Sequence, residues 1–169
     1  MTFPILTTER LTLRRLSIDD RQEIFSLRSN TEINKYLDRE PSKTSEDAII
    51  FINKINENIE KGGTYYWAIS LKETKELVGT ICLFDFSIKK NSCEIGYELL
   101  MNYQKQRIMQ EAAEKVIEFV FQTLKFTKIL AFTHSENQNS TNLLLKLNFL
   151  KSIEQDIDNP KLTIFTLTK

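Results

Sequence analysis

The sequence predicts a mixed α/β (α+β) fold, in which one twisted, mostly antiparallel sheet carries helices on both faces. Three observations indicate this fold. Strand-like stretches joined by short polar turns fill residues 64–100, a helix-like stretch over residues 108–124 leads into another strand, and a short helix followed by two strands ends the chain. A meander followed by a strand, helix and strand crossover builds a mixed sheet, because such a crossover joins parallel strands.

The first third of the chain has the pattern of a strand followed by two helices. Residues 10–16 (RLTLRRL) alternate apolar and polar side chains, which is the period of a half-buried strand. The acidic pair at residues 19–20 begins a short helix. A second helix is predicted over residues 44–62, where Thr44 and Asp47 form a capping-box pattern and Gly62 is a natural stop.

The middle of the chain reads as three antiparallel strands. Residues 64–72, 76–86 and 92–100 are rich in β-branched and aromatic side chains, and the polar turns ETK and KKN separate them. Such strands with short connections favour a meander.

The last third switches between helical and strand periods. Apolar residues at helical spacing predict a helix over residues 108–124. A strand over residues 127–135 follows, then a helix over 136–149, and finally two strands over 149–154 and 162–168.

Size and composition favour a single domain that spans residues 1–169. With 169 residues and 41% hydrophobic content, the chain has enough apolar surface for one sizeable core. Lys plus Arg equals Asp plus Glu at 23 each, so the net charge argues for neither a nucleic-acid nor a membrane partner. Cys82 and Cys93 lie in apolar runs, as expected of buried thiols in a reducing compartment. We predict a cytoplasmic protein, since no run reaches signal-peptide or membrane-spanning length.

Five stretches in order carry a resemblance to a known family. They are TERLTLRRL with the acidic pair that follows, the hairpin TYYWAISLKETKELVGTICL, CEIGYELL, the helix start Glu111-Ala112, and ENQNSTNLLLKLNF. Together they resemble the GCN5-related N-acetyltransferase (GNAT) superfamily, and within it the RimJ/RimL-like branch of ribosomal-protein N-acetyltransferases. The resemblance covers almost the whole chain, and it implies a GNAT-like fold with a splayed central strand pair.

The resemblance also implies a cofactor, acetyl-CoA, held where strands 92–100 and 127–135 splay apart. Its pantetheine arm is expected near Leu99 and Leu100, and its pyrophosphate on the loop YQKQRIMQEA at the start of the next helix. The implied cofactor-binding residues are Leu99, Leu100, Gln104, Lys105, Gln106, Arg107, Ile108, Met109, Gln110, Asn137 and Ser140.

This loop departs from the family pattern of Gln or Arg, two residues, Gly, one residue, then Gly or Ala. Gln104 matches, but Arg107 and Met109 occupy the small positions, and Lys105 replaces a frequent glycine. Arg107 therefore either adopts an unfavourable conformation or reshapes the loop. Because backbone N–H donors remain and the new side chains add positive charge, we expect acetyl-CoA binding to be retained. Asn148 also replaces a family glycine, at a helix end where Asn is the best substitute.

Acetyl transfer needs a deprotonated amine, a polarised carbonyl and a proton for the leaving thiolate. Glu94, which shares a strand face with Gly96 and Glu98, is the first candidate for a base acting through water; the alternative is a surface carboxylate. The N–H of Leu99 or Leu100 polarises the carbonyl if the strand bulges there.

Other candidate residues lie near the last helix. Asn137 and Ser140 match an Asn-x-x-Ser pattern that implies cofactor contacts and, for the serine, a catalytic role near the thiol; the alternative is ordinary helix capping. Leu144 stands where many relatives outside this branch carry a tyrosine that serves as the general acid, and Ser140 is the remaining hydroxyl candidate. The lone His134 is interpreted as structural or exposed, and no metal site is predicted. Residues 65–67 (YYW) belong to an acceptor pocket or to the core.

The leading hypothesis is an acetyl-CoA-dependent N-acetyltransferase that transfers acetyl to a primary amine by direct attack. The amine belongs to a protein N-terminus or to a small molecule, and a homodimer is left open. The alternative is a degenerate GNAT-fold protein whose substituted loop serves a ligand- or protein-binding role without acetyl transfer.

Overall fold

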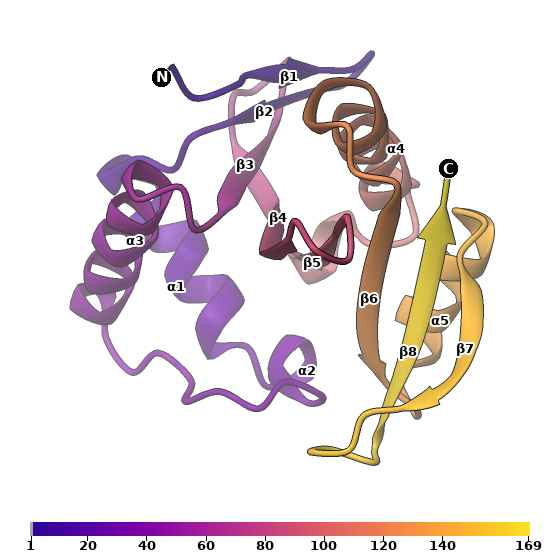
Figure 1. Cartoon of the computed structure of the whole chain (residues 1–169). Coiled ribbons are helices and arrows are strands. Elements are labelled where there is room, and N and C mark those ends of the chain that lie inside the picture. The colour runs from indigo at the N-terminus through magenta and orange to yellow at the C-terminus, as the bar shows by residue number, and fades with distance from the viewer. Residues whose placement is uncertain (1) are drawn as a thin grey trace.

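The structure, a computed structural model, describes residues 2–169 and contains an eight-stranded sheet with the order β1-β2-β3-β4-β5-β6-β8-β7 (Figure 1). Neighbouring strands are antiparallel except for β5 and β6, which pair in parallel. The strands are β1 (Leu6–Thr7), β2 (Leu11–Arg14), β3 (Tyr65–Leu71), β4 (Leu77–Ser87), β5 (Ser92–Leu99), β6 (Lys128–His134), β7 (Leu150–Gln155) and β8 (Leu162–Thr168). The helices are η1 (Ile18–Asp20), α1 (Arg21–Ser29), α2 (Thr31–Asn34), α3 (Ser45–Glu60), η2 (Met101–Tyr103), α4 (Ile108–Phe119), η3 (Val120–Leu124) and α5 (Gln138–Lys146).

The predicted mixed sheet with helices on both faces is confirmed. Helices α4 and α5 cover one face, where their apolar residues join those of β2 to β6 in one core. Helices α1 and α3 cover the other face and pack around Tyr66, Ala68 and Leu77. Figure 1 shows α1, α2 and α3 grouped to one side of the central strands and β6, β7 and β8 on the other.

Local capping explains where the N-terminal helices begin. The Thr44 side chain accepts a hydrogen bond from the N–H of Asp47, and the Asp47 side chain accepts one from the N–H of Thr44, as the predicted capping box requires. A second box, of Ser17 and Asp20, starts η1. The sequence did not predict β1 or α2, since each is too short to show a period.

The helix predicted over residues 108–124 is wrong in its last turn. Residues Ile108–Phe119 are α-helical, but Val120–Leu124 wind as a π-helix before Lys125 turns left-handed at φ 64°. Apolar spacing does not distinguish these windings, because the same side chains face the core in both. Asn148 has a φ of 67°, as expected of an asparagine that replaces a capping glycine.

The aromatic cluster of β3 belongs to the core. Trp67 is fully buried, and its ring lies against Phe3, Tyr65 and Phe119. The acceptor-pocket alternative for Tyr65, Tyr66 and Trp67 is therefore wrong, because their neighbours are the core of the sheet and α4 on one face and the α1 and α3 core on the other.

The central strands β5 and β6 splay apart, as predicted. They pair only at their first three positions, from Ser92 with Lys128 to Glu94 with Leu130. Beyond these pairs each strand continues without the other, so a gap opens between residues 95–99 and 131–134. Backbone groups that face this gap are left available to a ligand.

Candidate active site

A cavity of about 600 Å³ lies beside the last residues of β5, where this strand no longer pairs with β6. It extends from α2, past the end of β5, to the N-terminus of α4 and to α5. The structure brings most of the predicted binding residues together there: Leu99, Gln104, Lys105, Arg107, Ile108, Met109, Gln110, Asn137 and Ser140 line the cavity. Leu100, Gln106 and Glu94 lie outside its lining.

The end of β5 offers the gap one N–H of the predicted pair. The Leu100 N–H donates to the Val78 carbonyl at 2.8 Å. Successive residues of an antiparallel strand point to opposite sides, so the Leu99 N–H faces the gap. The expected role for the Leu100 N–H is wrong, because it is already bonded to β4, and the irregularity in this strand pair lies elsewhere, between Phe84 and Ser87.

The loop before α4 keeps the backbone shape that glycine usually provides. Lys105 and Arg107 have φ angles of 62° and 61°, in the left-handed region. For residues with a side chain this region costs about 1–2 kcal/mol each. Of the two alternatives, the structure therefore shows Arg107 in the unfavourable conformation. Gln104 steadies the start of the loop, since its Nε2 donates to the Leu99 carbonyl at 3.1 Å.

This loop forms the N-terminus of α4 and carries positive charge. Arg107 is the N-cap residue, and within the described chain its side chain makes no capping hydrogen bond. The first N–H groups of a helix lack intrahelical partners and carry the positive end of the helix dipole. With the cations of Lys105 and Arg107 beside them, these N–H groups suit a phosphate-type anion.

A pair of hydroxyl groups lies on the α5 side of the cavity. The Tyr97 and Ser140 hydroxyl oxygens share a hydrogen bond of 2.8 Å, and both residues line the cavity. Burial raises the pKa of Tyr97 to about 12, against a smaller lowering by Ser140. Tyr97 was not predicted as a site residue, although strand alternation places it on the face opposite Glu94. Asn137 caps α5 by accepting from the Ser140 N–H, as the alternative interpretation expected.

Two contacts on the α2 side were also missed. Glu98 lines the cavity, and its carboxylate is 2.7 Å from a guanidinium nitrogen of Arg39. Tyr36 lies against His134 with ring centroids 5.0 Å apart, which joins the segment after α2 to the end of β6. His134 thus contacts an aromatic ring, in agreement with the structural interpretation.

Glu94 lies at the closed end of the gap. It is the last residue of β5 that pairs with β6. Burial, followed by the hydrogen bond and charge of Asp85 and by the charge of Asp156, raises the pKa of Glu94 to about 7. A carboxylate with this pKa changes its charge near neutral pH, as a general base requires.

Comparison with known proteins decides the family. The acetyltransferase (GNAT) domain family matches residues 10–150. The chain belongs to the GNAT acetyltransferases. These are enzymes that transfer acetyl from acetyl-CoA to amines, so the resemblance seen in the sequence is confirmed.

The acetyltransferase also matches individual proteins over most of its length. It is 34% identical over 149 residues to YoaA, an uncharacterised N-acetyltransferase of Bacillus subtilis (strain 168), covering 88% of this chain and 84% of that one. A solved structure of a candidate ribosomal-protein-serine acetyltransferase from Vibrio cholerae has 25% identity and a TM-score of 0.86, with both chains fully covered. Spermidine N-acetyltransferase from Vibrio cholerae, solved with CoA and spermine, shares the fold at a TM-score of 0.80 and 18% identity, covering 95% of this chain and 96% of that one.

Proposed function

We propose that this acetyltransferase uses acetyl-CoA to acetylate a primary amine, on a protein N-terminus or a small molecule. The observation that supports the proposal most is the loop before α4. Although the loop lacks glycine, Lys105 and Arg107 hold the left-handed backbone that glycine adopts readily. This backbone conformation supports an anion site at the head of α4, even though the sequence of the loop is substituted.

In the proposed complex, the pyrophosphate binds at the loop and the pantetheine arm runs along the gap. The N–H groups at the start of α4 and the charges of Lys105 and Arg107 receive the phosphates. The arm lies along the edge of β5 that faces the gap, next to Leu99. The other proposed contacts are made by residues that line the cavity: Gln104, Ile108, Met109, Gln110, Asn137 and Ser140. Leu100 and Gln106 lie outside the lining and stay predicted cofactor contacts.

The proposed chemistry is a direct transfer. Acetyl-CoA supplies a thioester, in which the carbon–sulfur bond breaks as the amine nitrogen bonds to the carbonyl carbon. Glu94 takes the amine proton through water, since it is set back from the cavity. The Leu99 N–H polarises the carbonyl. Ser140 delivers its hydroxyl proton to the thiolate sulfur while it takes the hydroxyl proton of Tyr97, and water then returns a proton to Tyr97.

Both acceptor classes have support among structural neighbours. One neighbour is named for a ribosomal-protein serine, and another was solved with spermine.

We place the chain near the RimJ/RimL-like branch as one domain over residues 1–169, acting in the cytoplasm. Among residues 2–169, no helix is long and apolar enough to cross a membrane. A free-thiol assay with a panel of amines and N-terminal peptides identifies the acceptor.

Cofactor binding is tested first by thermal shift. We expect acetyl-CoA at 100 times its dissociation constant to stabilise the protein by about 2.7 kcal/mol, because ligand binding favours the folded state. Adenosine, which has no phosphate, serves as the control. If saturating acetyl-CoA gives no shift, the degenerate GNAT-fold protein without acetyl transfer becomes the better description.

The charge of Arg107 is tested by Arg107→Gly. Glycine fits the backbone but removes the cation, so we expect acetyl-CoA to bind a few-fold more weakly, with a flatter dependence on salt. Exposed ion pairs are screened over about 8–10 Å at physiological ionic strength. Calorimetric titration at low and high salt measures both effects.

Lys125→Gly is the matched control for Arg107→Gly. Lys125 is also a cationic residue with a left-handed backbone, at φ 64°. It lies at the C-terminal end of η3, however, and does not line the cavity. Its replacement should leave acetyl-CoA affinity unchanged. Tighter binding by Arg107→Gly would show that the arginine obstructs the loop and would contradict charge replacement.

A further inference from the structure

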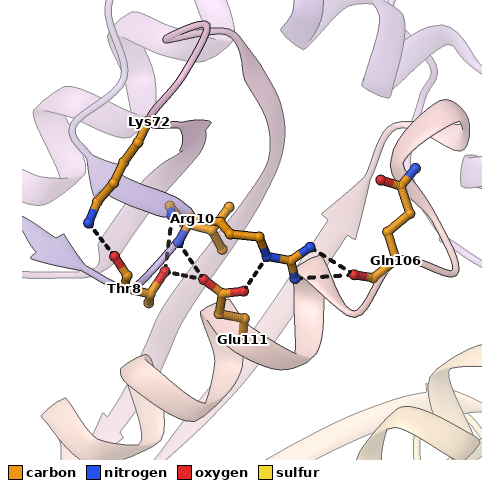
Figure 2. A network of polar contacts seen from close by, with 6 residues as sticks. Thr8, Arg10, Lys72, Gln106 and Glu111 are labelled. Atoms are coloured by element: carbon orange, nitrogen blue, oxygen red, sulfur yellow. Dashed lines mark hydrogen bonds and ion pairs between the residues drawn. The ribbon is translucent and has the colours of Figure 1, made fainter.

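A polar network joins the N-terminal strands to the loop before α4 (Figure 2). Its centre is the carboxylate of Glu111, in the first turn of α4. One carboxylate oxygen accepts from the Thr8 hydroxyl at 2.5 Å and from the Arg10 N–H at 2.9 Å, and the other accepts from Arg10 Nε at 2.7 Å. Lys72 Nζ in turn donates to the Thr8 carbonyl. Glu111 thus fixes the guanidinium of Arg10 in one orientation.

The far end of that guanidinium contacts the loop backbone. Arg10 Nη1 and Nη2 both donate to the Gln106 carbonyl, each at 3.1 Å. Gln106 lies between the two left-handed residues, Lys105 and Arg107. Figure 2 shows the Gln106 side chain pointing away, so that the backbone carbonyl alone meets Arg10.

This contact fixes the orientation of one peptide plane. A trans peptide is planar, and its C=O and N–H point in opposite directions. Because the Gln106 carbonyl is held toward Arg10, the Arg107 N–H points away from Arg10. Arg107 lines the cavity, and a carbonyl turned toward a phosphate would repel it. The same contact opposes relaxation of Lys105 and Arg107 out of the left-handed region, which would rotate this plane.

We propose that Arg10, oriented by Glu111, is a positioning residue for cofactor binding: it holds the glycine-free loop in its anion-binding shape. The inference rests on the proposed function, because the ligand concerned is the pyrophosphate of acetyl-CoA. Arg10 itself does not line the cavity. Arg10 acts through the Gln106–Arg107 peptide. It stabilises the left-handed backbone conformation of Lys105 and Arg107, which glycine would adopt without such support.

The test measures acetyl-CoA affinity by calorimetry in Arg10→Ala, Arg10→Lys and the matched control Arg15→Ala. Arg15 is a neighbouring arginine of similar exposure that pairs with Glu60 instead. We expect Arg10→Ala to weaken binding about tenfold or more and to raise the KM for acetyl-CoA with little change in kcat. Arg10→Lys keeps the charge but loses the two-pronged contact, so it should not restore affinity. Arg15→Ala should leave affinity unchanged.

Glycine in the loop separates positioning from general stability. In a Lys105→Gly, Arg107→Gly background, the left-handed turns need no support, so Arg10→Ala should weaken binding less than roughly threefold. A purely structural brace would give Arg10→Ala a lower Tm with unchanged affinity, or an equal loss in both backgrounds, and either result overturns the proposal. If Arg10→Ala fails to fold, Arg10→Lys in the two backgrounds decides. No acetyl-CoA binding by the wild type or the glycine variant overturns the proposed function itself.

Discussion

Replacing Glu94 with glutamine is expected to lower turnover by roughly 10²- to 10⁴-fold while leaving acetyl-CoA affinity nearly unchanged, because a positioned base contributes about this much. The amide keeps the size of the side chain but cannot accept a proton. Steady-state kinetics with saturating acceptor, together with calorimetric titration of acetyl-CoA, measure the two quantities separately. Unchanged turnover would contradict the proposed role of Glu94 as the base and favour the alternative of a surface carboxylate.

The matched variant is Glu98→Gln. Glu98 lies on the same face of β5 but lines the cavity and pairs with Arg39. If Glu94 is the base, Glu98→Gln should change the KM for the acceptor more than kcat. A loss of turnover in Glu98→Gln, with Glu94→Gln unaffected, would assign the base to Glu98.

The pH dependence gives an independent measure of Glu94. Since burial and then Asp85 and Asp156 raise its pKa to about 7, activity should rise with pH through that value as the carboxylate ionises. Stability should change in the opposite direction. The folded chain holds the proton more tightly than the unfolded chain, so the free energy of unfolding falls as pH rises from the usual carboxyl range to about 7. Glu94→Gln should remove this fall, and the Tm at pH 5 and at pH 8 measures the change.

Replacing Trp67 with alanine is expected to destabilise the fold by about 3–5 kcal/mol. The indole is fully buried between Phe3, Tyr65 and Phe119, and its Nε1 donates to the Pro4 carbonyl at 2.8 Å. Alanine leaves a cavity where these rings meet and removes the partner of that carbonyl. Urea denaturation followed by circular dichroism measures the loss.

The control for Trp67→Ala is Ile88→Ala. Ile88 is a large apolar residue on the surface, with 91% of its area exposed, and its replacement should change the free energy of unfolding by less than about 0.5 kcal/mol. If Trp67→Ala lowered the free energy of unfolding by less than about 1 kcal/mol, the expectation that the buried indole strongly stabilises the core would be wrong. Because Phe119 belongs to α4, we also expect weaker acetyl-CoA binding wherever the variant remains folded.

Elements with a local signature were predictable from the sequence. The helix after Thr44 has a capping box and an apolar period, and the β3 to β5 meander has short polar turns. The splay of β5 from β6 followed from the resemblance. Their parallel pairing followed from the helix that joins them, which is long enough for a crossover. The backbone at Arg107 was predictable only as an alternative, because its conformation depends on contacts outside the loop.

Contacts between distant parts of the chain could not be predicted from periodicity. Arg39 and Glu98 are 59 positions apart, and Arg10 and Glu111 are 101 apart. Neither pair has a pattern in the intervening sequence, since strand and helix periods report only which face a residue occupies. The prediction for the Leu100 N–H was wrong for a related reason. Its hydrogen bond to the Val78 carbonyl depends on the register between β4 and β5, and the side-chain pattern does not determine which backbone atoms pair.

The left-handed turns of Lys105 and Arg107 also affect the entropy of ligand capture. A loop of glycines samples many backbone states when it is empty and loses that freedom when it closes on a phosphate. Side chains at both positions reduce the number of states that the loop can visit, and the grip of Arg10 on the Gln106 carbonyl selects one of them. The loop therefore has less disorder to lose on binding. The loop loses some close approach of its backbone to the phosphate, but it gains preorganisation. The conformational strain of Lys105 and Arg107 is introduced when the chain folds and not each time the ligand binds.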